Sequence, residues 1–252
     1  MIHFVGAGPG GPDLITVRGA RLLEQADVII YAGSLVNPAL LDDAKKGCAL
    51  HNSAEMTLDE VIAVMKAAEA QGKTTVRLHT GDPSVYGAIR EQMDRLDEAG
   101  IPFAVCPGVS SFCGAAAALQ AEYTLPGVSQ SVILTRMAGR TPVPEGESIR
   151  ALAAHGATMV IFLSAGMTEA LQRELLAGGY SPETPAAIVY KATWPDEAVV
   201  RCTVGSLHQA AESHSIRNLA LITVGDFLGE TYDLSKLYDP TFTTAFRQVH
   251  PE

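Results

Sequence analysis

The chain has 252 residues and a formal net charge of −10 at pH 7; 47% of its residues are hydrophobic and 18% are charged. This composition is typical of a globular protein and excludes a disordered or fibrous one. A chain of this size can bury one large α/β core or two ordinary domains without disulfide or metal support. Its negative mean charge repels polyanions, so we expect no nucleic-acid partner and no binding to anionic membranes.

The N-terminal sequence and the cysteine spacing predict location and metal content. Residues 1–4 contain no basic region, and no apolar run approaches the roughly 18 residues that span a bilayer. We therefore expect a cytoplasmic protein without membrane contact. The cysteines, which form no CxxC pair, favour buried free thiols over zinc or disulfides; they are Cys48, Cys106, Cys113 and Cys202. The seven histidines form no HxxxH or HExxH motif, so no metal ligands are predicted.

In residues 1–119, short runs rich in valine and isoleucine alternate with longer segments of helical period. This pattern predicts an α/β domain with a mostly parallel sheet and crossover helices. The expected strands are 2–5, 28–31, 75–79 and 103–106, and the expected helices are 16–25, 57–71, 84–99 and 110–119. Helical spacing on the third helix predicts a core-facing stripe, formed by Tyr86, Ile89, Met93 and Leu96.

A second alternating unit is predicted over residues 131–228, after a linker at 120–130 that contains Pro126 and Gly127. Its expected strands are 131–135, 158–163, 186–190, 199–204 and 218–224. Residues 194–196 contain a Trp-Pro-Asp turn, which favours an antiparallel hairpin of the third and fourth strands and hence a mixed second sheet. Residues 229–252 are expected to form a polar tail.

The glycine-rich turn at residues 6–11 satisfies the GxGxxG spacing of dinucleotide-binding folds. Two features weaken an NAD-binding interpretation. Pro9 and Pro12 remove amide donors that would hold a pyrophosphate, and residues 31–33 lack the carboxylate that binds a ribose. A different nucleoside-type ligand is therefore favoured, while a tight turn without a ligand stays open.

Two further loops, at residues 79–87 and 106–111, also follow predicted strands. Ligands of open α/β sheets bind at the carboxyl ends of strands, where helix N-termini present unpaired amides. The alternatives are that Asp82 or Ser84 caps one helix and that Ser110 caps the next. The sequence contains no GxSxG nucleophile motif. For His79, a structural role at the end of a strand is favoured over the role of a general base.

The second unit has two candidate ligand motifs. Arg136 and Arg140 lie in a loop rich in glycine and proline, where guanidinium groups could bind carboxylates in bidentate fashion or simply face solvent. Trp194 lies near Lys191 in the predicted hairpin. Core packing and ligand stacking both stay open for this tryptophan.

Taken together, these motifs resemble the tetrapyrrole methylase family over nearly the whole chain. The general family motifs are residues 6–16, 80–87 and 107–111. More specific motifs resemble the members that methylate ring carbon 11 of a precorrin-4-type macrocycle in cobalamin biosynthesis, with or without cobalt; they are residues 31–36, 130–142 and 190–195. The resemblance implies two α/β domains that form a cleft, S-adenosylmethionine bound between them, and a homodimer.

The resemblance also implies a set of ligand contacts. The cofactor contacts would be Pro9, Thr80, Gly81, Asp82, Val85, Ser110, Ser111, Ser164 and Ala192. The macrocycle carries many carboxylates, and its proposed contacts are Tyr86, Arg90, Arg136 and Arg140. No catalytic side chain is assigned, because the sulfonium methyl group is already activated and the ring carbon is the nucleophile.

Three other functions are compatible with parts of this sequence. Another tetrapyrrole methylase is possible, but relatives that methylate uroporphyrinogen carry an aspartate where this chain has Ala32. An NAD-dependent oxidoreductase would use the glycine turn as a dinucleotide site. A noncatalytic corrinoid-binding protein would bind the macrocycle without turnover.

Overall fold

The computed structural model describes residues 1–248, and the chain divides into two compact units. The first unit comprises Met1–Leu119 together with Val189–Ala198; the second comprises Gln120–Ile188 and the chain from Val199 onward. The segment expected as a linker, residues 120–130, thus lies within the second unit. The expected tail also lies in the second unit, and its last four residues, 249–252, are outside the described residues.

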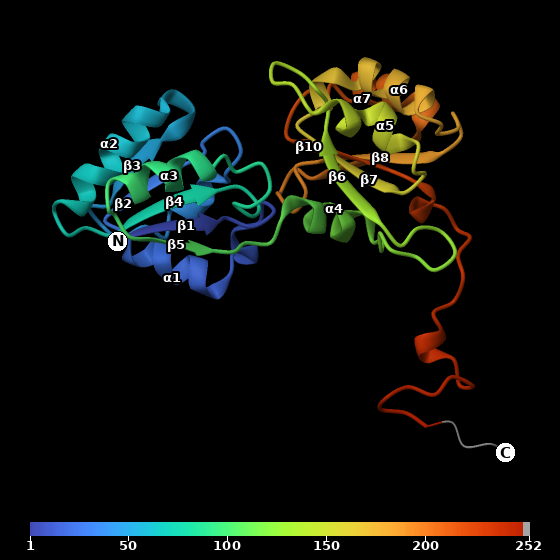
Figure 1. Ribbon diagram of the computed structural model, residues 1–252, viewed down its shortest axis with the longest axis horizontal. Helices are drawn as coiled ribbons and strands as arrows, with labels where there is room; N and C mark the ends of the chain where they lie inside the picture. The colour runs from blue at the N-terminus through green and yellow to red at the C-terminus, as the bar shows by residue number, and fades with distance from the viewer. Residues whose placement is uncertain (249–252) are drawn as a thin grey trace. The chain divides into compact units, whose positions relative to one another are not determined.

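A five-stranded parallel sheet forms the centre of the first unit (Figure 1). Its strands are β1 Ile2–Gly6, β2 Val28–Tyr31, β3 Ala49–Asn52, β4 Thr75–His79 and β5 Phe103–Cys106, in the order β3-β2-β4-β1-β5. All four pairings between these strands are parallel, as the sequence predicts. The edge strand β3 was not predicted, because its sequence Ala-Leu-His-Asn contains no β-branched or aromatic residue of the kind that favours strands.

Helices cover both faces of this sheet (Figure 1). They are α1 Val17–Gln25, α2 Leu58–Glu69 and α3 Arg90–Glu98, and the unit also contains α4 Ser111–Leu119. Side chains alternate along β1, so Val5 packs with Leu23 of α1 while Phe4 packs with Met65 of α2 on the opposite face. Because both faces are covered, the inner strand β2 has the continuous apolar sequence Val-Ile-Ile-Tyr.

The first two helices each begin directly after a capping threonine. The Thr16 hydroxyl accepts a hydrogen bond from the Gly19 amide at 3.1 Å, ahead of α1. Thr57 and Glu60 form a reciprocal capping box ahead of α2, in which the Thr57 amide donates to Glu60 Oε2 at 2.7 Å. Each cap satisfies amides that have no partner inside the helix.

The third helix begins later than predicted. Instead of spanning residues 84–99, α3 starts at Arg90, since the backbone turns left-handed at Tyr86 (φ 56°) and at Ala88 (φ 49°). Tyr86 is 45% exposed and lies outside the expected stripe, whereas its other three members pack in the core. Side-chain periodicity alone could not detect this turn, because the apolar spacing of the segment continues through the residues whose backbone is left-handed.

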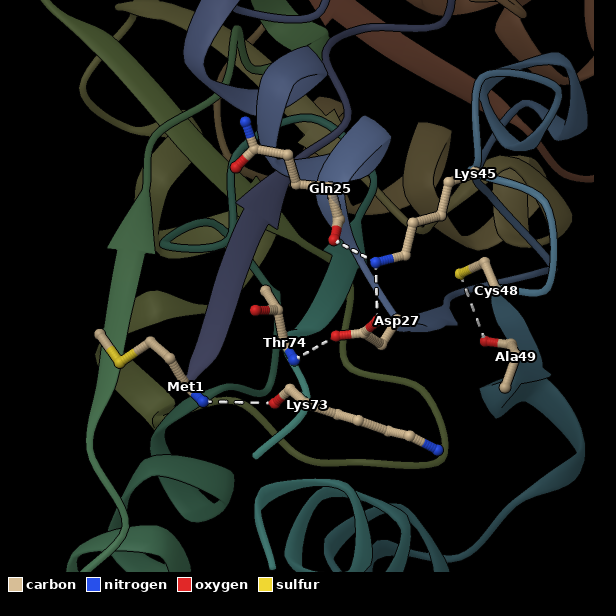
Figure 2. A network of polar contacts seen from close by, with 8 residues as sticks. All are labelled: Met1, Gln25, Asp27, Lys45, Cys48, Ala49, Lys73 and Thr74. Carbon is tan, nitrogen blue, oxygen red and sulfur yellow. Dashed lines mark hydrogen bonds and ion pairs between the residues drawn. The ribbon is translucent and has the colours of Figure 1, made fainter. Parts of the chain in front are cut away.

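Polar contacts tie together the amino-terminal edge of the first sheet (Figure 2). Asp27, just before β2, accepts hydrogen bonds from the Thr74 amide at 2.8 Å and from Lys45 Nζ at 2.6 Å. The Lys45 hydrogen bond, followed by that of Thr74, lowers the pKa of Asp27. The Met1 ammonium donates to the Lys73 carbonyl at 3.4 Å. This network lies at the opposite edge of the parallel sheet from the candidate ligand loops.

The second unit contains a mixed five-stranded sheet, as predicted. Its strands are β6 Val132–Arg136, β7 Thr158–Phe162, β8 Pro185–Tyr190, β9 Ala198–Thr203 and β10 Ala220–Val224, in the order β6-β7-β10-β8-β9. Strand β6 is parallel to β7, while β10 is antiparallel to it. Its helices are α5 Ile149–Ala153, α6 Thr168–Ala177 and α7 Leu207–Ser213, which lie side by side in Figure 1.

Single-turn 3-10 helices connect many of these elements. Those described are Pro12–Leu14, Pro38–Leu41, Ser53–Glu55, Glu145–Glu147, Ala165–Met167, Val204–Ser206, Asp226–Leu228 and Lys236–Tyr238. No helix within residues 1–248 has the length and hydropathy needed to cross a membrane. The expectation of buried thiols is correct for Cys106 but wrong for Cys113, which is exposed; Cys48 and Cys202 are half-buried.

Three glycines allow the carboxyl ends of β1, β4 and β5 to approach closely. A Cβ added to Gly6 would lie 2.5 Å from Gly108 Cα and 2.6 Å from the Gly81 carbonyl oxygen. A Cβ added to Gly108 would collide with the same carbonyl and lie 2.7 Å from Gly6 Cα. Any side chain at these positions would push the strand ends apart.

We therefore expect Gly108→Ala to lower the free energy of unfolding by about 1–3 kcal/mol, because backbone atoms must shift to admit the methyl group. Gly146→Ala is the matched control, since its added Cβ has no neighbour within 4 Å. That change should stay within about 0.5 kcal/mol. Urea unfolding followed by circular dichroism measures both, and equal effects would contradict the steric argument.

Candidate functional site

Backbone hydrogen bonds join the loops that follow β1 and β4. The Ala7 amide donates to the His79 carbonyl at 2.7 Å. Gly8 and Gly81 exchange two hydrogen bonds, of 3.2 Å from the Gly8 amide and 2.8 Å from the Gly81 amide. The glycine turn and the loop after β4 therefore form one connected backbone surface at the carboxyl edge of the sheet.

Asp82 joins the loop after β4 to the loop after β5. Its Oδ2 accepts a hydrogen bond from the Gly108 amide at 2.8 Å, while Oδ1 accepts from both the amide and the hydroxyl of Ser84. Partial burial disfavours the charged form, but the hydrogen bonds from Ser84 and Gly108 outweigh it and lower the pKa of Asp82. Asp82 is thus a loop connector, and it does not cap α3, which begins eight residues later.

The segment Val189–Ala198 holds the other side of the glycine turn. Thr193 Oγ1 accepts a hydrogen bond from the Gly11 amide at 2.8 Å. A Cβ at Gly10 would collide with the Trp194 ring and lie 2.6 Å from the Ala192 carbonyl oxygen. The half-buried Trp194 therefore packs against the glycine turn, and ligand stacking stays a prediction.

Sequence reasoning missed two residues that fix this turn. Asn37 Nδ2 donates to the Gly10 carbonyl at 2.9 Å, and its Oδ1 accepts from the Ala39 amide ahead of a 3-10 helix. The Asn-Pro pair at residues 37–38 is a cap signal that could have identified it. Thr193 gave no such signal, because its partner is 182 residues away in the sequence.

The ammonium group of Lys191 interacts with two neighbouring side chains. Its Nζ lies 2.6 Å from Asp196 Oδ2 and 5.2 Å from the centre of the Trp194 ring, within cation-π range. The backbone of Lys191 and Thr193 is left-handed, with φ of 44° and 67°. Such strain persists only where surrounding contacts enforce it. The strained residues belong to the segment that holds the glycine turn.

The hydrogen bonding of the glycine turn argues against a dinucleotide site. The amides of Ala7, Gly8 and Gly11 all donate to protein acceptors. Pro9 and Pro12 have no amide hydrogen to donate. Pyrophosphate recognition requires free amides directed at the phosphates, so the GxGxxG spacing serves loop packing in this chain.

The predicted cofactor contacts of the first unit gather around the start of α4. A Cβ at Gly81 would lie 3.1 Å from the Ser111 amide nitrogen, and one at Gly114 would lie 2.6 Å from Pro9 Cβ. Ser110 is buried, and its carbonyl accepts from the amide of residue 113. The loop after β4 contains Gly81 together with Thr80, Asp82 and Val85. Ala192 lies against the glycine turn, with its carbonyl oxygen close to Gly10.

Ser164, a predicted cofactor contact in the second unit, already has protein partners. It is fully buried, its hydroxyl donates to the Phe162 carbonyl at 2.7 Å, and its oxygen accepts from the Met137 amide at 2.9 Å. Its side chain therefore shapes the turn after β7. A ligand role for Ser164 stays a prediction.

The arginines predicted to bind substrate differ in their surroundings. Arg136 donates to three carbonyls of its own loop, those of Met137, Thr141 and Pro142, at 2.9–3.2 Å. Arg90 is exposed and forms an ion pair with Asp94 one helical turn away, with Nε 2.8 Å from Oδ1. Arg140 is exposed.

His79 is buried in the first unit, with 4% of its surface exposed. Its ring stacks on Phe4 at a centroid distance of 6.2 Å, and its Nε2 has no hydrogen-bond partner among residues 1–248. Burial, and then the charge of Arg77, lower its pKa to about 3. Because burial opposes protonation of this ring, His79 is a weak proton acceptor.

The fold and these loops define an α/β protein whose parallel sheet gathers glycines, hydroxyl groups and one fixed carboxylate at its carboxyl edge. The family described as Tetrapyrrole (Corrin/Porphyrin) Methylases matches residues 1–208. The chain belongs to this family.

Individual relatives agree with this assignment. The chain is 53% identical to the cobalt-precorrin-4 C(11)-methyltransferase of Methanocaldococcus jannaschii, over 99% of this chain and 96% of that protein. A solved cobalt-precorrin-4 methyltransferase, described as a cobalamin biosynthetic enzyme, is 48% identical, with a TM-score of 0.88 over 91% of this chain and 96% of that one. Uroporphyrin-III C-methyltransferase of Thermus thermophilus, solved with S-adenosylhomocysteine, is 26% identical, with a TM-score of 0.75 over 90% and 93%.

We expect Asp82→Asn to lower the free energy of unfolding by about 1–3 kcal/mol, because an amide cannot accept all the hydrogen bonds that the carboxylate receives. Asp94→Asn removes a carboxylate from the exposed ion pair with Arg90 and should cost at most about 1 kcal/mol. Denaturant titration of the two variants makes the comparison. An Asp82 variant as stable as the Asp94 variant would contradict the connecting role.

The buried His79 should make the free energy of unfolding decrease as the pH falls. The pKa of His79 is about 3 in the folded chain, against 6.5 for a histidine in water. Below pH 6.5 the unfolded chain therefore binds a proton that the folded chain does not bind. Stability should fall by up to about 1.4 kcal/mol per pH unit through this residue.

In His79→Leu this contribution is absent, so the variant should lose less stability than the natural chain between about pH 6.5 and about pH 5. Urea unfolding at several pH values measures the difference. Parallel pH dependences of the two proteins would show that His79 titrates normally in the folded state.

Proposed function

We propose that this chain is an S-adenosylmethionine-dependent methyltransferase that methylates ring carbon 11 of cobalt-precorrin-4 or precorrin-4 in cobalamin biosynthesis. The observation that carries this proposal is the 53% identity to a protein of that name over 99% of the chain. The connected loops at the carboxyl edge of the first sheet support it, because they provide a built surface where ligands of α/β folds bind.

The chemistry of these loops fits S-adenosylmethionine, which supplies an activated methyl group when bound. The groups available are backbone carbonyls and the hydroxyls of Thr80, Ser110 and Ser111, beside close-packed glycines. Such neutral polar groups suit an adenosine and an amino acid better than a pyrophosphate. The proposed contacts are Pro9, Thr80, Gly81, Asp82, Val85, Ser110, Ser111 and Ala192, with Ser164 from the second unit.

The residues of the chain mainly have to orient the two reactants and exclude water. The ring carbon is itself the nucleophile, so no side chain needs to be activated. Correct placement alone supplies roughly 7–11 kcal/mol in favourable reactions. Asp82 contributes by fixing two loops in register, and His79 is a weak proton acceptor.

Carboxylates of the macrocycle are proposed to bind Arg136, Arg140 and Arg90. Within residues 1–248, the hydrogen-bond partners of Arg136 are neutral carbonyls, which do not compensate its charge. Arg140 is exposed, and Arg90 would have to exchange Asp94 for the substrate. These differences rank Arg136 and Arg140 ahead of Arg90. Tyr86, exposed on the loop after β4, is the proposed aromatic contact.

A homodimer and a cytoplasmic location belong to the same proposal and rest on the family resemblance and the sequence. Analytical ultracentrifugation tests the dimer directly, and a purely monomeric protein at micromolar concentration would refute it. Methylation of uroporphyrinogen is the alternative within the family. Ala32 argues against it, because relatives with that activity are expected to have an aspartate there.

The test is methyl transfer from labelled S-adenosylmethionine to purified precorrin-4 and cobalt-precorrin-4, compared side by side with uroporphyrinogen III. We expect label on one of the first two macrocycles, at carbon 11 by nuclear magnetic resonance. Transfer to uroporphyrinogen alone, or binding without transfer, would refute the proposal.

Cofactor binding has an independent optical signal. Trp194 is the single tryptophan of the sequence and packs on the glycine turn, so S-adenosylhomocysteine should change its fluorescence. NAD should leave the fluorescence unchanged, because the amides of Ala7, Gly8 and Gly11 already donate to protein acceptors. A response to NAD alone would favour the oxidoreductase alternative.

A further inference from the structure

Arg77 is a buried cation without a carboxylate partner. It lies in the middle of β4 with 7% of its surface exposed, and burial lowers its pKa to about 10. Within residues 1–248 it forms no ion pair. Its guanidinium instead donates to neutral oxygens, from Nε to Gln92 Oε1 at 3.1 Å and from Nη1 to the Ile30 carbonyl at 3.2 Å. Buried charges are usually paired, so this arrangement needs a reason.

Gln92 carries this interaction from the core to the loop after β4. It lies on α3 with 5% of its surface exposed, and its Nε2 donates to the Ala88 carbonyl at 2.9 Å. A guanidinium can only donate hydrogen bonds, so Gln92 must turn its oxygen toward Arg77 and its NH₂ group toward Ala88. Arg77 thereby sets which end of the Gln92 amide faces the loop.

The loop that receives this hydrogen bond is strained. Tyr86 and Ala88 both have left-handed backbone, which costs roughly 1–2 kcal/mol for a residue with a Cβ. Asp82 anchors the beginning of the loop through Gly108, and Gln92 anchors its end at Ala88. Tyr86, the proposed aromatic contact of the macrocycle, lies between these two anchors.

We propose that Arg77 and Gln92 are positioning residues that hold the loop of residues 83–88 in its strained form, so that Tyr86 is presented to the macrocycle. This inference rests on the proposed function for its substrate, but the hold on the loop is a property of the first unit alone. The neutral glutamine is what the position requires, since a carboxylate would pair better with Arg77 yet could not donate to Ala88.

Gln92→Glu separates these two effects. The new carboxylate gives Arg77 a counter-ion, so the melting temperature should be unchanged or higher. The ionised side chain has no hydrogen to donate to the Ala88 carbonyl, so the loop should be released. We expect the KM for the macrocycle to rise about tenfold, as for loss of one positioning hydrogen bond. S-adenosylhomocysteine affinity should change by less than about threefold, because Val85 is the single proposed cofactor contact within residues 83–88 and Asp82 still joins its loop to Gly108.

Gln71→Glu is the matched control. Gln71 makes the same kind of bond, from Nε2 to the carbonyl four residues earlier, at 3.1 Å from the Ala67 oxygen on α2. The same substitution there should leave the KM unchanged. Hydrogen exchange provides a readout without substrate: amides of residues 84–89 should exchange faster in Gln92→Glu than in the natural chain, and normally in Gln71→Glu.

Unchanged exchange of this loop, or an unchanged KM in Gln92→Glu, would overturn the inference. A loss of activity accompanied by a lower melting temperature and equally weakened S-adenosylhomocysteine binding would also overturn it, because that pattern marks a general structural role. If the natural chain methylates no macrocycle, the proposed function fails, whereas the exchange experiment still decides whether Gln92 holds the loop.

Discussion

The close approach of three strand ends at Gly6, Gly81 and Gly108 is the constraint on which the site depends. With no side chains between them, the loops after β1, β4 and β5 bond directly to each other, and the Asp82 carboxylate accepts the Gly108 amide across the junction. These contacts restrict the backbone conformations of the three loops. A surface made in this way is preorganised, which matters for a reaction in which placement supplies most of the acceleration.

The segment Val189–Ala198 completes this arrangement from a distant part of the sequence. Thr193 occupies the Gly11 amide, and Trp194 covers Gly10. The glycine turn therefore has the spacing of a dinucleotide fingerprint, but its amides at Ala7, Gly8 and Gly11 donate hydrogen bonds to the protein itself. The same spacing is thus compatible with different ligands, and the partners of the amides decide between them.

Charge is distributed in a way that suits an acidic chain with an anionic substrate. Lys191 is paired with Asp196, and Arg90 with Asp94, while Arg136 has only carbonyl partners in its hydrogen bonds. Arg77 is buried and contributes through Gln92 instead of through a carboxylate. The cations thus differ in function according to their partners, which their positions in the sequence do not reveal.

The sequence by itself determined the alternation of strands and helices, the mixed second sheet and the loops that bear the family motifs. These follow from local rules: apolar period within the elements, and glycine and proline at the turns. It missed the edge strand β3 and placed the start of α3 six residues too early, at residue 84. It also could not assign Val189–Ala198 to the first unit. Only the tertiary structure decided these points, because hydrogen bonds such as those of Thr193 and Gln92 join residues whose pairing leaves no periodic trace in the sequence.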